Sequence, residues 1–312
     1  MNWMNLPECP NSSHPRTRSR IRFQIRARRG VESSWGVGTR EVILFECPRC
    51  GLRFREPPSQ SEIEEFYKSV YHEKMVGVAD EERTRTYRLE NLERIKALKR
   101  FCPNGSVLDV GCSRGHLASQ LSEAGYDVFG ADLSEDACSE AARLLGSDHV
   151  HCGPIEDLPA KFGERFDAVT LMDVIEHVED VARSLRAIRD CLKEGGILFL
   201  RTPTLRSPFY KVADWSYFFT AGLYKGAVLR VYHAEHLYFF NETNLKQMLA
   251  EAGFEVLEIS PDPLLWVNFR SAELRFDWGV NAALSAVYWL GRLFGRGHGM
   301  RVVARRLPDR GA

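Results

Sequence analysis

The chain has 312 residues, of which 44% are hydrophobic and 27% charged, and its formal net charge at pH 7 is zero. This length is enough to bury a substantial core, so one large domain with one or two appendages is expected. The balanced charge gives no global field for nucleic acid, and no run reaches the roughly 18–20 apolar residues of a membrane-spanning helix. The first residues lack the apolar core of a secretory signal, and the eight cysteines are scattered, so we expect a cytoplasmic protein.

Residues 1–60 are predicted to be irregular, because Pro, Ser, Gly and Arg dominate and only Val42–Phe45 forms an apolar run. Seven arginines make the first thirty residues basic: Arg16, Arg18, Arg20, Arg22, Arg26, Arg28 and Arg29. Such a run is typical of a solvated face, with an electrostatic guide for nucleic acid or a membrane surface as the alternative.

A helical cap or linker is predicted over 61–104. Apolar residues recur there at threes and fours, as expected for a stripe that faces the core: Tyr87, Leu89, Leu92, Ile95, Leu98 and Phe101. Pro103 to Gly105 ends this helix.

From residue 105 onward, short apolar runs alternate with amphipathic helices. Strands are expected at 107–110, 127–131, near 150, and at 166–172, 197–200, 254–259 and 300–304, with helices at about 115–125, 135–145, 179–192 and 242–252. This alternation predicts parallel βαβ units with right-handed crossovers, and so a Rossmann-like α/β fold over 105–312.

Two inserts interrupt this plan. The first, at 205–240, is rich in aromatic residues, and the second, at 264–297, carries apolar positions at helical spacing. Packing as core or lid explains both, while a substrate-binding wall is the alternative for the first. A peripheral membrane contact around 278–296 is an alternative for the second.

The strand, loop and helix at 107–121 carry the strongest local signal. A doubly wound sheet binds its ligand beyond the carboxyl ends of the strands, and Gly111 and Gly115 permit close backbone approach there. Asp132, after the second strand, is placed to accept hydrogen bonds from two ribose hydroxyls of NAD or S-adenosylmethionine. Asp109 favours the second cofactor, because a carboxylate there would repel a pyrophosphate but suits a sulfonium with an amino group.

Several stretches resemble, in the right order, class I S-adenosylmethionine-dependent methyltransferases, in the branch of the ubiquinone-biosynthesis O-methyltransferases. They are Leu108–Gly115, Gly130–Ser134, Gly153–Pro159, Phe166–His177, Leu192–Leu198, Thr202–Pro203, Glu235–Phe240 and Ala252–Phe254. The resemblance implies a three-layer sandwich around a mostly parallel seven-stranded sheet with an antiparallel last strand. It implies cofactor contacts from Asp109, Gly111, Cys112, Gly115, Asp132, Leu133, Ile155, Glu156 and Met172, with Asp173 as the alternative to Met172.

One position departs from the family. Ser113 stands where a glycine is usual, giving Gly-Cys-Ser-Arg-Gly. If the position needs a positive φ, serine carries a strain cost, although its small side chain could still fit.

His177 and His236 are the candidate acid–base residues. His177 follows the fourth strand, where a near-neutral imidazole could accept a proton from a substrate hydroxyl as that hydroxyl attacks the methyl group. The alternative for His177 is a histidine at a helix start that bonds to backbone. His236, like His233, lies in a segment expected to fold over the substrate or to be fixed there by packing. Transfer by proximity alone, without a base, is a third possibility.

Cys47-Pro-Arg-Cys50-Gly51 resembles one knuckle of a zinc ribbon, and related methyltransferases often carry two. The other knuckle here is Cys9-Pro-Asn-Ser12, in which serine replaces the second cysteine. Zinc needs four donors, so His14 is the candidate that completes a set with Cys9, Cys47 and Cys50. A degenerate site or ordinary thiols are the alternative. Further on, 66–72 resembles a tyrosine-containing segment that caps the cofactor.

The predicted function is methyl transfer to a small molecule, at oxygen, with the 205–240 insert lining the acceptor site. An aromatic lining suits a lipid, quinone, polyketide or sugar-derived acceptor. An RNA or protein methyltransferase guided by the basic N-terminus is one alternative, although the fourth strand at 170–176 lacks the Asn-Pro-Pro-Tyr type of signature. A non-catalytic relative that binds the cofactor or a partner is the other.

Overall fold

The computed structural model describes residues 7–11, 13, 17–26, 41–55, 81–220, 223, 228, 231–232, 236–262, 286, 291 and 297–309. His14, His233, 66–72 and nearly all of 264–297 lie outside these residues, and so do Arg16, Arg28 and Arg29. Among the residues described, no helix combines the length and apolar character needed to cross a membrane.

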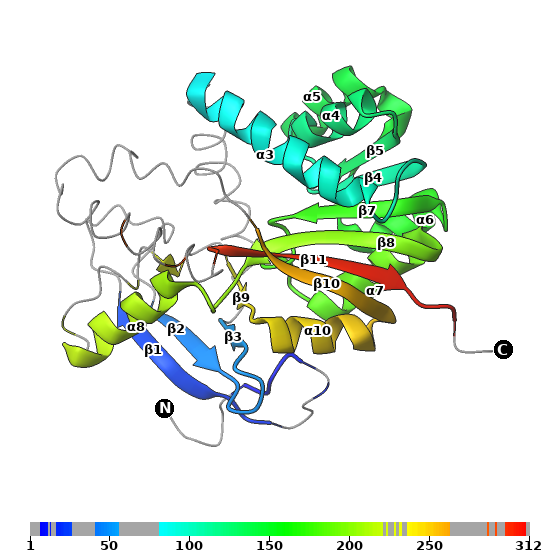
Figure 1. Cartoon of the computed structure of the whole chain (residues 1–312). Helices are drawn as coiled ribbons and strands as arrows, with labels where there is room; N and C mark the ends of the chain where they lie inside the picture. Colours follow the sequence, from blue (N-terminus) through cyan, green and yellow to red (C-terminus); the bar gives the residue numbers. More distant parts are fainter. Residues whose placement is uncertain are drawn as a thin grey trace.

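A seven-stranded sheet forms the centre of the molecule, in the order β10-β11-β8-β7-β4-β5-β6 (Figure 1). Its strands are β4 (Ser106–Val110), β5 (Asp127–Asp132), β6 (Val150–Cys152), β7 (Phe166–Met172), β8 (Leu192–Pro203), β10 (Phe254–Asp262) and β11 (Gly299–Arg306). The first five run parallel, whereas β11 is antiparallel to both β8 and β10. The predicted mostly parallel sheet with an antiparallel last strand is therefore confirmed.

Helices cover both faces of this sheet. They are α3 (Glu81–Lys99), α4 (His116–Glu123), α5 (Glu135–Leu145), α6 (Leu158–Phe162), α7 (Val181–Cys191) and α10 (Glu242–Glu251), with one-turn 3₁₀ helices η3 (Ser147–His149) and η4 (Ile155–Asp157). Side chains of α3 and α4 pack with Val107 on one face, while those of α7 and α10 pack with Leu108 on the other. Consecutive strand residues are thus both buried, which explains the continuous apolar runs in the sequence.

The predicted apolar stripe of α3 is only half buried. Ile95 and Leu98 are 5% and 1% exposed, whereas Tyr87, Leu89 and Leu92 are between 42% and 48% exposed. The prediction of a core-facing stripe was wrong for these three residues, because Glu90 and Asn91, at 5% and 6% exposed, form the buried face of this part of the helix. Helical spacing identifies the helix but does not show which of its faces is covered.

A second sheet is built from β1 (Arg20–Arg26), β2 (Glu41–Glu46), β3 (Arg53–Phe54) and β9 (Tyr238–Phe239), all antiparallel. Three of these strands lie in 1–60, which the sequence predicted to be irregular. In β1, arginine and glutamine alternate with isoleucine and phenylalanine, a period-2 pattern that the arginine count obscured. Because β9 comes from the first insert, this sheet joins the N-terminal part of the chain to that insert.

The first insert also contributes α8 (Pro208–Phe219), which packs beside the second sheet. Its Tyr210 contacts Tyr232 and Phe239 edge-to-face, and all three side chains are buried. The described aromatic residues of this cluster therefore pack as core.

Candidate functional site

The loop between β4 and α4 has the backbone geometry of a ligand-binding turn. Gly111, Ser113 and Gly115 have φ values of 73°, 48° and 80°. The N–H groups of Gly111 and Cys112 both donate to the carbonyl of Ala131, at 2.7 and 3.0 Å, which fixes the loop against the end of β5. A Cβ at position 111 would collide with the side chain of Val174, so glycine is required there.

The backbone of Ser113 has a positive φ of 48°, the left-handed conformation for which a strain cost was predicted. This conformation costs an L-residue about 1–2 kcal/mol. A partial compensation is visible, because the Ser113 N–H donates to Asp132 Oδ2 at 2.8 Å. The other oxygen of Asp132 accepts from the Ser134 N–H at 2.9 Å, so the carboxylate is held in one orientation at the carboxyl end of β5.

Asp109 lies beneath the loop and is 3% exposed. Thr170, its neighbour on β7, donates its hydroxyl to Asp109 Oδ1 at 2.7 Å. Burial raises the pKa of Asp109 to about 7, even though the Thr170 hydrogen bond acts in the opposite direction. The carboxyl group can therefore gain or lose its proton near neutral pH.

The remaining predicted cofactor residues surround the same loop. Leu133 is 56% exposed and follows Asp132, while Cys112 is buried in the loop itself. Ile155 packs against the core, and Glu156 accepts from the Ser184 hydroxyl of α7 at 2.7 Å. Met172 is partly buried at the end of β7. All of them lie at or just beyond the carboxyl ends of β4, β5, β6 and β7.

The two predicted acid–base histidines meet after β7. The rings of His177 and His236 lie 4.8 Å apart, edge to face. Ligand atoms of Glu176, His177 and His236 all lie within 4.8 Å of one another, a grouping that could also hold a cation. Backbone contacts fix this arrangement, since the N–H groups of Leu237 and Tyr238 both donate to the carbonyl of Glu176.

Glu176 lies beside the two histidines, although the sequence predicted no role for it. It is 1% exposed, and the Thr202 hydroxyl donates to its Oε2 at 2.9 Å, while Oε1 is buried and has no hydrogen-bond partner among the described residues. Burial, followed by the charge of Asp173, raises the pKa of Glu176 to about 8. The only sequence signal for it was its place in the motif at 166–177.

Asp173 follows Met172 with φ 56° and forms an ion pair with Arg201. Arg201 is buried and also binds Asp262 at 3.0 Å. These ion pairs hold the backbone between β7 and the histidine pair, so Asp173 has a structural role there.

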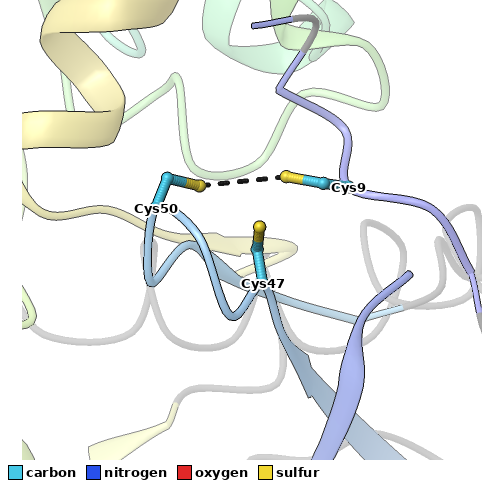
Figure 2. A group of neighbouring side chains, drawn as sticks. All are labelled: Cys9, Cys47 and Cys50. Atoms are coloured by element: carbon cyan, nitrogen blue, oxygen red, sulfur yellow. Dashed lines mark hydrogen bonds between the residues drawn. The ribbon is translucent and has the colours of Figure 1, made fainter. Parts of the chain in front are cut away.

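Three of the four predicted metal ligands converge. Figure 2 shows the thiols of Cys9, Cys47 and Cys50 directed toward one another, with Cys47 and Cys50 in the turn between β2 and β3. The Cys9 and Cys50 sulfurs are 3.8 Å apart, and all three side chains are buried. The hydrogen bond between them lowers the pKa of Cys50 to about 5 and raises that of Cys9.

The thiol cluster is tied to α10. Asn241 caps that helix and also donates its side-chain amide to the Cys50 carbonyl at 2.9 Å. From the same turn, β3 leads to pairing with β9, two residues beyond His236. The predicted metal residues and the predicted acid–base residues are thus joined through backbone contacts.

A buried ionic network links the second sheet to the first insert. Arg53 binds Glu46 and Asp214 at 2.8 Å each, and Asp214 also accepts from the Tyr232 hydroxyl at 2.8 Å. Arg22 binds Asp214 at 3.0 Å, and Arg20 pairs with Glu46. Two arginines of the basic run therefore have partners inside the protein.

The family model described as a methyltransferase domain matches residues 80–259. The chain belongs to this family. It is a class I S-adenosylmethionine-dependent methyltransferase.

The curated relatives agree with this assignment. The ubiquinone biosynthesis O-methyltransferase of Hydrogenovibrio crunogenus is 34% identical over 182 residues, covering 55% of this chain and 73% of that protein. The protein of the same name from Bordetella avium is 36% identical over 116 residues. These residues cover 36% of this methyltransferase and 48% of the Bordetella protein. The match to the second relative thus spans about half of its length.

Solved structures share the fold. A complex between the Haloferax volcanii Trm112 methyltransferase activator and a methyltransferase matches with a TM-score of 0.56 and 19% identity, over 80% of this chain and 99% of that one. Magnesium protoporphyrin IX methyltransferase from Synechocystis PCC 6803, with bound S-adenosylhomocysteine, has a TM-score of 0.53 and 15% identity, over 80% and 100%. At these identities the likeness supports the fold alone.

Proposed function

We propose that this methyltransferase transfers the methyl group of S-adenosylmethionine to a hydroxyl of a small, ring-containing molecule. The observation that carries the proposal is the His177–His236 pair beside buried Glu176, at the end of the strand next to the cofactor loop. The named role of the relatives in ubiquinone biosynthesis supports an oxygen acceptor.

The proposed cofactor site consists of the residues around the β4–α4 loop. Asp132 accepts from the ribose hydroxyls, Leu133 and Ile155 contact the adenine face, and Glu156 lies at its edge. Gly111 and Gly115 let the backbone approach the methionine part, beside Cys112, Met172 and Asp109. The donor set fits this cofactor, because Asp109 and Asp132 suit an amino group, a sulfonium and hydroxyls but would repel a phosphate.

Bound S-adenosylmethionine supplies an electrophilic methyl group on sulfur. The proposed role of His177 is to accept the hydroxyl proton of the acceptor as its oxygen attacks. Its neighbour His236, two residues before β9, holds the ring of His177 in place, and Glu176 provides an adjacent buried carboxyl. Alignment of the two reactants by the surrounding walls contributes in addition to this proton transfer.

We also propose that Cys9, Cys47 and Cys50 bind a structural zinc ion. Three buried thiols within 4.8 Å of one another, two of them from a Cys-x-x-Cys turn, suit its preference for sulfur ligands. The fourth ligand predicted from the sequence, His14, is not among the described residues. Purified protein should contain about one zinc per chain, whereas Cys50→Ser should contain none; a Cys102→Ser variant is the matched thiol control.

The acceptor proposal is tested with S-adenosylmethionine carrying a labelled methyl group. The acceptors are a phenol and a catechol, each with and without an alkyl tail, alongside an alkylamine and a carboxylate. Transfer to a hydroxyl is the expected result, and transfer only to nitrogen or carboxylate would contradict it.

The base proposal is tested with His177→Ala, which should lower kcat by about 10²–10⁴-fold with little change in cofactor affinity. His236→Ala should have a smaller effect, and His116→Ala, at the start of α4, is the histidine control. If His177→Ala retains full kcat over the whole pH range, transfer proceeds by alignment alone.

A further inference from the structure

Cys138 and Cys152 lie together at the proposed ribose site, apart from the zinc ligands. The Cys138 thiol donates to the carbonyl of Asp132 at 3.4 Å and lies 3.8 Å from that of His151. The Cys152 thiol lies 4.0 Å from the carbonyl of Leu133, the residue that follows Asp132. Both sulfurs therefore contact the backbone that carries the proposed ribose and adenine residues.

The two cysteines come from different elements. Cys138 is on the second turn of α5 and is buried, whereas Cys152 ends β6, opposite Asp132 in the parallel pairing, and is exposed. Gly153, the next residue, donates its N–H to the carbonyl of Asp132 at 2.9 Å. A covalent bond between the two sulfurs would join α5 to the start of the segment at 153–156.

We propose that Cys138 and Cys152 form a reversible disulfide that weakens S-adenosylmethionine binding. This inference rests on the cofactor site proposed above. A disulfide requires a sulfur–sulfur distance of about 2.05 Å, shorter than any thiol hydrogen bond. Closing that gap moves the end of β6 toward α5, and with it the Asp132 hydrogen bond and the Ile155–Glu156 turn.

With hydrogen peroxide as the oxidant, the disulfide forms in two steps, and Cys152 reacts first because its side chain is exposed. The Cys152 thiol releases its proton, and the thiolate attacks one peroxide oxygen. The O–O bond breaks, the departing hydroxide takes up that proton, and the products are a Cys152 sulfenic acid and water. The Cys138 sulfur then attacks the Cys152 sulfur, its proton leaves with the departing oxygen, and a second water is released. Two thiols are oxidised by two electrons, and one peroxide is reduced to two waters.

Burial supports the assignment of Cys138 to the second step. Burial, followed by the contact with Cys152, raises the pKa of Cys138 to about 12, so this thiol stays protonated and does not react first. The carbonyl groups that accept its hydrogen bonds belong to β5 and β6, so the sulfur is already directed at the junction of the two strands.

The experiment oxidises the full, zinc-loaded protein with hydrogen peroxide and measures two quantities. Differential alkylation with peptide mass spectrometry locates any disulfide, and calorimetry with S-adenosylmethionine measures affinity before oxidation, after it, and after dithiothreitol. We expect a Cys138–Cys152 peptide lighter by two hydrogens and an affinity at least tenfold weaker, restored by the reductant. Cys138→Ser and Cys152→Ser should lose both effects. Cys102→Ser, which replaces a buried thiol three residues after α3, should keep both.

Several results would overturn the proposal. These are oxidation of Cys152 to sulfinic acid without a bond to Cys138, a disulfide between other thiols, or unchanged affinity in the cross-linked protein. Failure of the cofactor site gives a different result: reduced protein would not bind, or Asp132→Ala would bind as well as wild type. In that case the proposed effect of the disulfide on cofactor affinity is also refuted. The mass spectrometry still shows whether the disulfide forms.

Discussion

The two sheets of this methyltransferase are stabilised by different kinds of contact. In the seven-stranded sheet, strand residues such as Leu108, Val169 and Leu198 are fully buried between helices on both faces. In the four-stranded sheet, β3 and β9 have two residues each, and an ionic network and a thiol cluster fasten it to the rest of the chain. A small sheet buries too little apolar surface to be stable alone, so these polar links add to its apolar contacts with Tyr210 and Tyr232.

The two sheets also have different proposed roles, one on the cofactor side of the site and the other on the acceptor side. The residues assigned to the cofactor all belong to the large sheet, whereas the small sheet holds β9 and so positions His236. Damage to the small sheet should therefore affect stability and the acceptor side, and it should leave cofactor affinity intact.

The largest expected effect comes from Arg53→Met in the small sheet. The substitution leaves Glu46 and Asp214 buried with fewer partners, and removing one member of a buried ion pair costs about 3–5 kcal/mol. Chemical denaturation should show this loss, while calorimetry should show unchanged affinity for S-adenosylmethionine. The control is Arg305→Met in the large sheet, whose exposed pair with Glu255 contributes about 1 kcal/mol or less. Equal losses in the two variants would contradict the comparison.

For Asp132→Ala in the large sheet, we expect the main loss in cofactor affinity rather than in stability. Loss of the carboxylate removes the proposed ribose contacts and the anchor of the Ser113 N–H, so affinity for the cofactor should fall about 100-fold, or about 2.7 kcal/mol. Asp127→Ala, at the exposed start of the same strand, should bind normally. Zinc content should be unchanged in both variants, because the thiol cluster belongs to the other sheet.

The sequence predicted the large sheet well and the small sheet poorly, for a physical reason. Buried parallel strands leave apolar runs, and the loop after β4 needs glycines and acids whose spacing is local. In the small sheet, the alternation in β1 is obscured by its arginines, and the pairing of 53–54 with 238–239 joins distant residues that share no local pattern. Arg53 and Asp214 are 161 positions apart, and nothing in either neighbourhood indicates the other. The motif at 166–177 includes Glu176, but nothing in the sequence indicated that its side chain is buried.

The pH dependence of stability should have opposite signs in the two sheets. Asp109 has a raised pKa of about 7, so its contribution is fully present below its unfolded pKa of about 3.8 and is lost as pH rises through about 7. For Glu46 burial acts to raise the pKa, but Arg20 and Arg53 outweigh it and lower the pKa below 4.5. Its contribution is present above pH 4.5 and is lost as pH falls through the lowered value.

Asp109→Asn separates these two contributions. Between pH 4.5 and 7 the unliganded variant should show a stability slope that differs from wild type by about one proton, measured by denaturation at each pH. Asp127→Asn should leave the slope unchanged. An Asp109→Asn slope identical to that of wild type would mean that Asp109 is ionised in the folded protein.

The smallest expected effect concerns Ser113, in the loop after β4, where the sequence predicted strain. Ser113→Gly removes a side chain from a left-handed backbone and should raise the free energy of unfolding by about 1 kcal/mol. The hydrogen bond to Asp132 comes from the backbone N–H, which glycine keeps, so cofactor affinity should change less than about threefold. Gly125→Ala is the opposite control, because φ is 94° there and no atom of the described residues would lie within 4 Å of an added Cβ. It should lose about the stability that Ser113→Gly gains, and a loss in both variants would show that the serine side chain stabilises the loop of the large sheet.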